Sequence, residues 1–330
     1  MTMRIGAILA AAALIAAVPP ARAQESYPTP EAAVRDLVDS AKAKTPGFGD
    51  RILGNDGAAL LRSGDADEDA ANLKEFNEAA AASTAIDDGP NGAKILRVGK
   101  NGWTLPLPLV KTDAGWRFDV AKGKEEMTNR RVGYNELSAI EACKAYVAAQ
   151  DEYFRLDRDG NGLREYARRF ISTPGTHDGL YWPPEDQADI SPLDGFAEDA
   201  NLAARSGEKP EPYKGYYYRI LTAQGPAAPG GALSYLINGH MIAGHAMVAW
   251  PATYGDSGVE TFICGENGVV YQKDLRAEHR RARRVDGPVQ SRRDVAGRRV
   301  AATHVSALVV PIGADEAPSF GHALPLTSKC

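Results

Sequence analysis

The stretch Gly215–Leu275 constrains the fold most strongly, because runs that favour β-strands alternate there with turns. Tyr216–Thr222, His245–Pro251 and Val259–Cys264 are rich in aromatic and β-branched residues and have no interior proline. A fourth run, Val269–Lys273, follows an Asn-Gly turn, which is a strong hairpin signal because both turn residues must accept a positive φ. The sequence therefore predicts an antiparallel sheet in which the last two runs are paired.

A long helix upstream is predicted to cover one face of this sheet. From Asn135 onward, a stripe of residues recurs every three or four positions, and the opposite side of the helix is charged. An antiparallel sheet with one solvated face needs such a cover on its other face. The predicted stripe consists of Leu137, Ile140, Cys143, Val147, Gln150 and Phe154. The charged segment Lys122–Arg131 before it is either a linker or helical.

Residues 24–125 are predicted to form a small α+β domain. Thr29 is placed to cap a helix that has Pro30 at its first position and Glu31 in its first turn. A second helix is expected at Asp67–Ala82, and the glycine-containing stretch Gly47–Gly57 is expected to be a loop. The predicted β-meander of this domain comprises Ala93–Val98, Thr104–Lys111 and Trp116–Val120.

Residues 1–23 have the pattern of a signal peptide. Arg4 precedes an apolar run, Ile5–Val18, and Ala21-Arg22-Ala23 provides the small residues of a cleavage site. The run is about 14 residues long, whereas roughly 20 are needed to span a bilayer. We therefore expect cleavage after Ala23 and a periplasmic or secreted protein, with no transmembrane segment after cleavage. The alternative is an uncleaved anchor helix.

Three cysteines are present, Cys143, Cys264 and Cys330. An exported protein can form disulfides, but an odd number without a spacing pattern is not a disulfide framework. A bond between Cys143 and Cys264 would join the long helix to the sheet. The alternative is that both are small buried apolar side chains.

Residues 276–330 differ in composition from the rest of the chain. Nine arginines stand within 276–299, and the whole segment has ten basic and five acidic residues. The chain has a net charge of −5, to which the leader contributes +2 and the segment 276–330 contributes +5, so residues 24–275 carry −12. A basic tail suits nucleic acid, but this one has no interleaved aromatic residues and belongs to an acidic, exported protein. We expect no nucleic-acid partner, and we interpret 276–330 as an aberrant tail, disordered or produced by a shifted reading frame.

Several long motifs, found in order along residues 27–275, resemble the DUF2950 family of exported bacterial proteins of unknown function. They are NELSAIEACKAYVAAQDEYFRLDRDGNGLREYA (Asn135–Ala167), DGLYWP (Asp178–Pro183), YKGYYYRILTAQGPAAPGGALSY (Tyr213–Tyr235) and MVAWPATYGDSGVETFI followed by GVVYQKDL. The second half, 126–275, is also similar to pilin-like periplasmic modules, in which a helix precedes an antiparallel sheet. That similarity implies a fold rather than a function.

The segment DRDGNG (Asp157–Gly162) matches positions 1, 3, 5 and 6 of a calcium-binding loop. Position 12, where a bidentate Glu is expected, is Arg168. The alternative is a turn of Asp, Asn and Gly that ends the long helix. The candidate oxygen ligands are Asp157, Asp159, Asn161 and Glu165.

Other patterns give little support to catalysis. Gly255–Gly258 (GDSG) is similar to the nucleophile motif of chymotrypsin-like proteases, but Val259 follows it and no matching His motif precedes it, so a turn is favoured. His240 and His245 lack the H-E-x-x-H pattern of zinc hydrolases. Four aromatic residues could form a ligand platform, although core packing is the expected use. They are Tyr181, Trp182, Tyr216 and Tyr218.

The sequence as a whole predicts a two-domain α+β exported protein, with boundaries at 1–23, 24–125, 126–275 and 276–330. We expect a non-enzymatic module that binds or assembles with other envelope proteins, with no cofactor and no assigned catalytic residue. The alternative is a periplasmic hydrolase.

Overall fold

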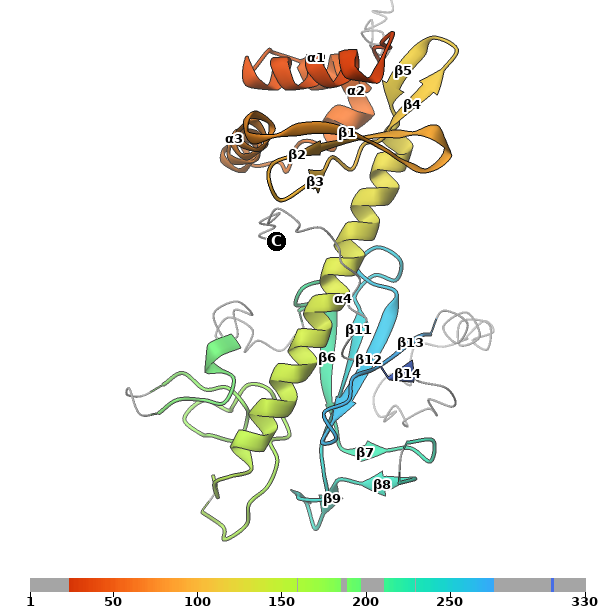
Figure 1. The fold of residues 1–330 in the computed structure, drawn as a ribbon. Helices are drawn as coiled ribbons and strands as arrows, with labels where there is room; N and C mark the ends of the chain where they lie inside the picture. Colours follow the sequence, from red (N-terminus) through yellow and green to blue (C-terminus); the bar gives the residue numbers. More distant parts are fainter. Residues whose placement is uncertain are drawn as a thin grey trace, which may run out of the picture. The chain divides into compact units, whose positions relative to one another are not determined.

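The computed structural model describes residues 24–158, 160–184, 189–196, 211–228 and 230–275, and the backbone of 310–311. Its helices and antiparallel sheets confirm the predicted α+β class (Figure 1). The chain divides between Glu126 and Met127 into two compact units, which are described separately. In the described part of the chain, no helix has both the length and the hydrophobicity required to cross a bilayer.

The first unit contains three helices and one antiparallel sheet, in which the strand order is β1-β2-β4-β5 and β3 pairs with β2. The helices are α1 (Pro30–Lys42), α2 (Phe48–Ala59) and α3 (Ala66–Ala82), and a short 3-10 turn covers Pro90–Gly92. The strands are β1 (Thr84–Asp88), β2 (Lys94–Val98), β3 (Trp103–Thr104), β4 (Leu109–Thr112) and β5 (Gly115–Phe118).

Helix α1 begins where its capping signals predict. The Thr29 hydroxyl accepts a hydrogen bond from the Ala32 amide at 3.2 Å, and Pro30 is the first helical residue. The predicted loop at Gly47–Gly57 is wrong, because this stretch forms α2. Ile52 and Leu53 are buried in the core, and this burial outweighs the low helix propensity of the glycines.

One predicted strand of the first unit is also wrong. The stretch Thr104–Lys111 forms the two strands β3 and β4 instead of one, and Pro106 and Pro108 lie between them. Proline has no amide N–H to donate to a neighbouring strand, so the ladder is interrupted there. The buried side chains of Leu107, Leu109 and Phe118 complete the core beneath the helices.

In the second unit, the part of the long helix α4 (Val120–Tyr153) that begins at Met127 packs against an antiparallel sheet (Figure 1). The order of the sheet is β14-β13-β12-β11-β6. Its strands are β6 (Tyr216–Leu221), β11 (Ala246–Pro251), β12 (Glu260–Gly265), β13 (Tyr271–Asp274) and β14 (Val310–Pro311). Two further hairpins pair β7 (Ala223–Gln224) with β8 (Leu233–Ser234) and β9 (Leu236–Ile237) with β10 (His240–Met241).

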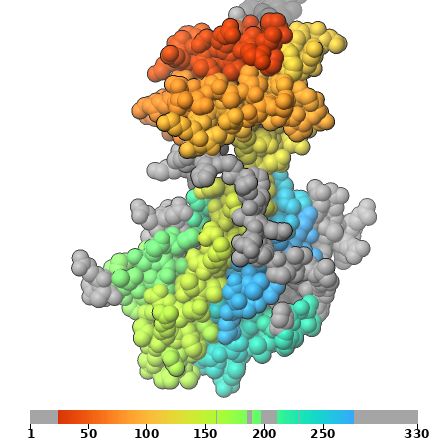
Figure 2. Space-filling model, in the orientation of Figure 1, coloured from red at the N-terminus to blue at the C-terminus, as the bar shows by residue number. Residues whose placement is uncertain are grey.

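The predicted hairpin around the Asn-Gly turn is confirmed, since β12 and β13 pair antiparallel with Glu260 opposite Asp274. Figure 2 shows α4 (yellow-green) beside the blue strands of this sheet at the surface of the second unit. The Glu136 carboxylate of α4 accepts the amides of Val259 and Glu260 at 2.8 and 3.0 Å. This contact fixes the start of β12 against the helix.

The buried face of α4 differs from the predicted stripe. Leu137, which was predicted to be buried, is 44% exposed, whereas Tyr146 and Tyr153 are buried. Their hydroxyls donate to the carbonyls of Ala246 at 3.1 Å and His177 at 2.8 Å. A stripe drawn from apolar residues omitted these tyrosines, which bury their rings once the hydroxyl finds an acceptor.

A disulfide between Cys143 and Cys264 joins α4 to β12. Both residues are fully buried, and their Cα atoms lie 5.9 Å apart. Of the two alternatives that the sequence left open, the structure has the bonded pair. The helix and the sheet are therefore connected covalently as well as by packing.

Candidate functional site

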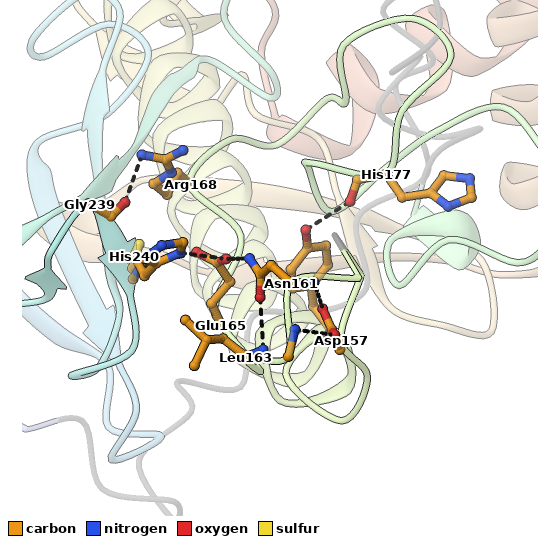
Figure 3. A network of polar contacts seen from close by, with 11 residues as sticks. Asp157, Asn161, Leu163, Glu165, Arg168, His177, Gly239 and His240 are labelled. Atoms are coloured by element: carbon orange, nitrogen blue, oxygen red, sulfur yellow. Dashed lines mark hydrogen bonds and ion pairs between the residues drawn. The ribbon is translucent and has the colours of Figure 1, made fainter.

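The loop that follows α4 is organised by its own polar side chains (Figure 3). The Asp157 carboxylate accepts the amides of Asn161 at 3.2 Å and Gly162 at 2.8 Å. The Asn161 side-chain oxygen in turn accepts the Leu163 amide at 2.8 Å. Gly160 and Gly162 have φ values of 64° and 82°, which allow the chain to reverse within this short span. The loop is thus a set of nested Asx turns.

Glu165 connects this loop to the β9–β10 hairpin (Figure 3). Its carboxylate lies 3.0 Å from Nδ1 of His240 and accepts the side-chain amide of Asn161 at 3.3 Å and the amide of Met241 at 3.4 Å. The Glu165 side chain is only 12% exposed. Burial alone would raise the pKa of Glu165, but these hydrogen bonds outweigh it and hold the pKa below its usual value.

Two more contacts join the same elements. Arg168 donates to the carbonyl of Gly239 at 3.2 Å, and the Tyr166 amide donates to the carbonyl of Met241 at 2.8 Å. We refer to Asp157–Arg168 together with Gly239–Met241 as the loop–hairpin network. Because contacts from both segments fix it, its exposed surface is held in one arrangement.

The predicted calcium ligands fall partly within this network. Asp157, Asn161 and Glu165 all bind groups of the network, and Asp159 lies outside the described residues. Among the described residues, no group of three or more His, Cys, Asp or Glu side chains is placed to hold a metal ion. The helix-ending turn accounts for the observed contacts, and calcium binding stays a prediction. The thermal midpoint in millimolar calcium and then in chelator tests it.

Ser257 lies in a turn. Its hydroxyl accepts the Thr253 amide at 2.9 Å and donates to the Thr253 carbonyl at 3.1 Å. Arg131 contacts Asp256 in the same turn. Both hydrogen bonds of the Ser257 hydroxyl are therefore made within the turn. This agrees with the interpretation of the GDSG motif as a turn.

His240 and His245 occupy different environments. His240 belongs to the loop–hairpin network, whereas His245 is 1% exposed and packs between the rings of Tyr146 and Tyr166. In the described part of the chain, neither ring nitrogen of His245 has a hydrogen-bond partner. Burial lowers the pKa of His245 to about 4, although nearby Asp151 partly opposes this effect.

Three of the four residues considered for an aromatic platform are core residues. Tyr181, Trp182 and Tyr216 are buried, and Tyr218 packs against the same core. The indole N–H of Trp182 donates to Asp189 at 2.9 Å. Core packing, the expected use of these residues, is the arrangement observed.

The protein is thus of the α+β class, and in its second unit a disulfide joins the helix to the sheet. Polar contacts hold the loop that follows this helix. Residues 24–286 match the family model described as protein of unknown function (DUF2950), and the chain belongs to this family. The match confirms the family resemblance seen in the motifs, and it ends within the segment 276–330. Comparisons with curated proteins and with solved structures gave no significant match. Apart from Val310 and Pro311, the tail lies outside the described residues.

Proposed function

We propose that this protein is exported to the cell envelope and acts there by binding a partner, without catalysing a reaction. The Cys143–Cys264 disulfide supports export, because such bonds persist in oxidising compartments such as the periplasm. The signal-peptide pattern of residues 1–23 agrees with this location.

The loop–hairpin network is the observation that carries the binding proposal. Large apolar side chains are exposed on its loop segment and beside the network. Leu156 is 57% and Leu163 40% exposed, and Leu233 and Ile237, on the adjoining hairpins, are 46% and 48% exposed. Polar contacts between the loop and the hairpin hold the network in place (Figure 3). A surface that is ordered before binding loses less conformational entropy when a partner arrives.

The alternative, a periplasmic hydrolase, has less support from the same contacts. Glu165 and His240 bind each other, and the Ser257 hydroxyl is occupied by its own turn. A serine nucleophile needs a base within hydrogen-bond reach, and these bonds do not provide one for Ser257. We therefore place the function in the exposed surface of the network.

Site-specific photo-crosslinking in cells tests the proposal. A photo-reactive residue in place of Leu156 or Leu163 should yield the same crosslinked species in the envelope fraction. Leu61, which is 42% exposed in the first unit, is the matched control and should not yield it. Equal crosslinking from all three positions would refute a binding role for the network. Recovery of the chain in the cytoplasm with residues 1–23 attached would refute export.

A further inference from the structure

A second cluster lies around Arg158, the residue that follows Asp157. The guanidinium carbon of Arg158 lies 5.4 Å from the centre of the Tyr153 ring and 5.1 Å from that of Trp182. Both distances are within the range of cation–π attraction. The ring of His177 lies 4.3 Å from that of Trp182 on the same cluster. The guanidinium is thus bordered by two aromatic rings, and His177 packs on one of them.

The rings that border Arg158 are held in place. Trp182 is 2% exposed and donates its indole N–H to Asp189, and the Tyr153 hydroxyl donates to the His177 carbonyl. His177 Nε2 lies 3.4 Å from the same Asp189 carboxylate. Because Asp189 interacts with both ring systems, it orients the aromatic side of the cluster.

The guanidinium of Arg158 has unused hydrogen-bonding capacity. Its Nε is buried and has no acceptor, and no carboxylate forms an ion pair with Arg158 within the described ranges. By contrast, Arg51 and Arg97 bind the carboxylates of Asp36 and Asp87. A buried, charged donor without an acceptor is costly, so an acceptor that arrives with a ligand would be bound favourably.

We propose that Arg158 is the binding site for an oxyanion, either the carboxylate or the phosphate group of a ligand. The planar guanidinium offers two parallel N–H donors to such a group, and stacking on Tyr153 and Trp182 fixes the direction of these donors. Arg158 belongs to the loop of the loop–hairpin network, but its ring partners, Tyr153 and Trp182, are not the exposed apolar residues to which we assign partner binding. The proposal therefore does not depend on the envelope role, and it can fail while that role stands.

Side-chain NMR of the mature chain tests this site with two probes, acetate and inorganic phosphate, at constant ionic strength. We expect one of them to shift the indole N–H resonance of Trp182 saturably, with a midpoint of about 1–10 mM, the range that two charge-assisted hydrogen bonds supply. Tighter binding of acetate would assign the site to a carboxylate ligand, and tighter binding of phosphate to a phosphate ligand. Absence of saturation by either anion up to about 100 mM would overturn the proposal.

Matched arginine variants distinguish anion binding at Arg158 from nonspecific attraction of anions by positive charge. Arg158→Gln should weaken anion binding at least tenfold, and Arg158→Lys, which keeps the charge but loses the planar fork, should weaken it less. Arg164→Gln is the control, because Arg164 lies 5.9 Å from the Phe154 ring and belongs to the same loop. It should leave the midpoint within twofold. Equal weakening by Arg158→Gln and Arg164→Gln would overturn the proposal. If Arg158→Gln does not fold, the comparison of Arg158→Lys with Arg164→Lys replaces it.

Discussion

Replacement of His245 by Phe should remove much of the acid sensitivity of the second unit. The imidazole is fully buried, packs at ring-centre distances of 5.3 and 4.7 Å from Tyr146 and Tyr166, and has no hydrogen-bond partner for either nitrogen among the described residues. Phenylalanine is aromatic and of similar size, and the substitution breaks no hydrogen bond. We therefore expect stability at pH 7.5 to be unchanged or slightly higher.

The sign of the pH effect follows from the lowered pKa. Burial lowers the pKa of His245 to about 4, whereas an unfolded histidine has a pKa near 6.5. Below pH 6.5 the unfolded state binds the proton more readily, so stability falls as the pH drops and the loss is complete below about pH 4. The full loss corresponds to about 3 kcal/mol, of which about 2 kcal/mol appears between pH 7.5 and 5.

Urea unfolding at a series of pH values measures this loss. The difference in the free energy of unfolding between the wild type and His245→Phe isolates the effect of the imidazole, because both proteins contain the same carboxylates that titrate at acidic pH. His177→Gln is the control, since the His177 side chain is 41% exposed and should contribute little. If wild type and His245→Phe lose the same free energy of unfolding between pH 7.5 and 5, the buried imidazole does not cause the acid sensitivity and the reasoning is refuted.

Three further predictions concern stability and are measured by urea or thermal unfolding. Loss of the Cys143–Cys264 bond in the double serine variant should cost about 4–5 kcal/mol, because the bond spans 121 residues of chain; an unchanged midpoint would contradict this. Thr29→Ala should lower the free energy of unfolding by about 1 kcal/mol, because the cap of α1 is lost, whereas Thr29→Ser should keep most of that stability. An equal loss in both variants would exclude capping as the cause. Gly258→Ala should cost about 1–3 kcal/mol because its Cβ would collide with the Tyr216 ring, whereas Gly225→Ala, with open space around it, should be neutral; similar losses in both would argue against the collision.

Local signals predicted those parts of the fold that depend on neighbours in sequence. The α1 start follows from Thr29 and Pro30, and the β12–β13 hairpin follows from its Asn-Gly turn. Helix α2 was missed because its glycines argue for a loop, and only the buried positions of Ile52 and Leu53 explain why it is helical. That burial depends on tertiary contacts, which the local pattern does not contain.

In the candidate site, too, local sequence predicted some features, whereas contacts between distant residues determine the others. The turn at Asp157–Gly162 was identified from its Asp, Asn and Gly residues, but the role of Glu165 was not. Its partner His240 stands 75 positions away, and no spacing rule connects the two. The Arg158 cluster was also missed, because Trp182 and His177 reach it from a segment without regular structure. The pairing of Cys143 with Cys264 stayed open because the two residues stand 121 positions apart and no spacing rule connects them.

The disulfide has a consequence for how the chain responds to proteases, which cut exposed segments. Cys143 and Cys264 close a covalent ring that contains the loop–hairpin network and the Arg158 cluster. A single backbone cut anywhere within that ring leaves the two fragments joined through sulfur. The nicked protein would migrate as one species without reductant and as two with it. Both candidate binding surfaces would thus stay attached to the helix and sheet that support them after such a cut.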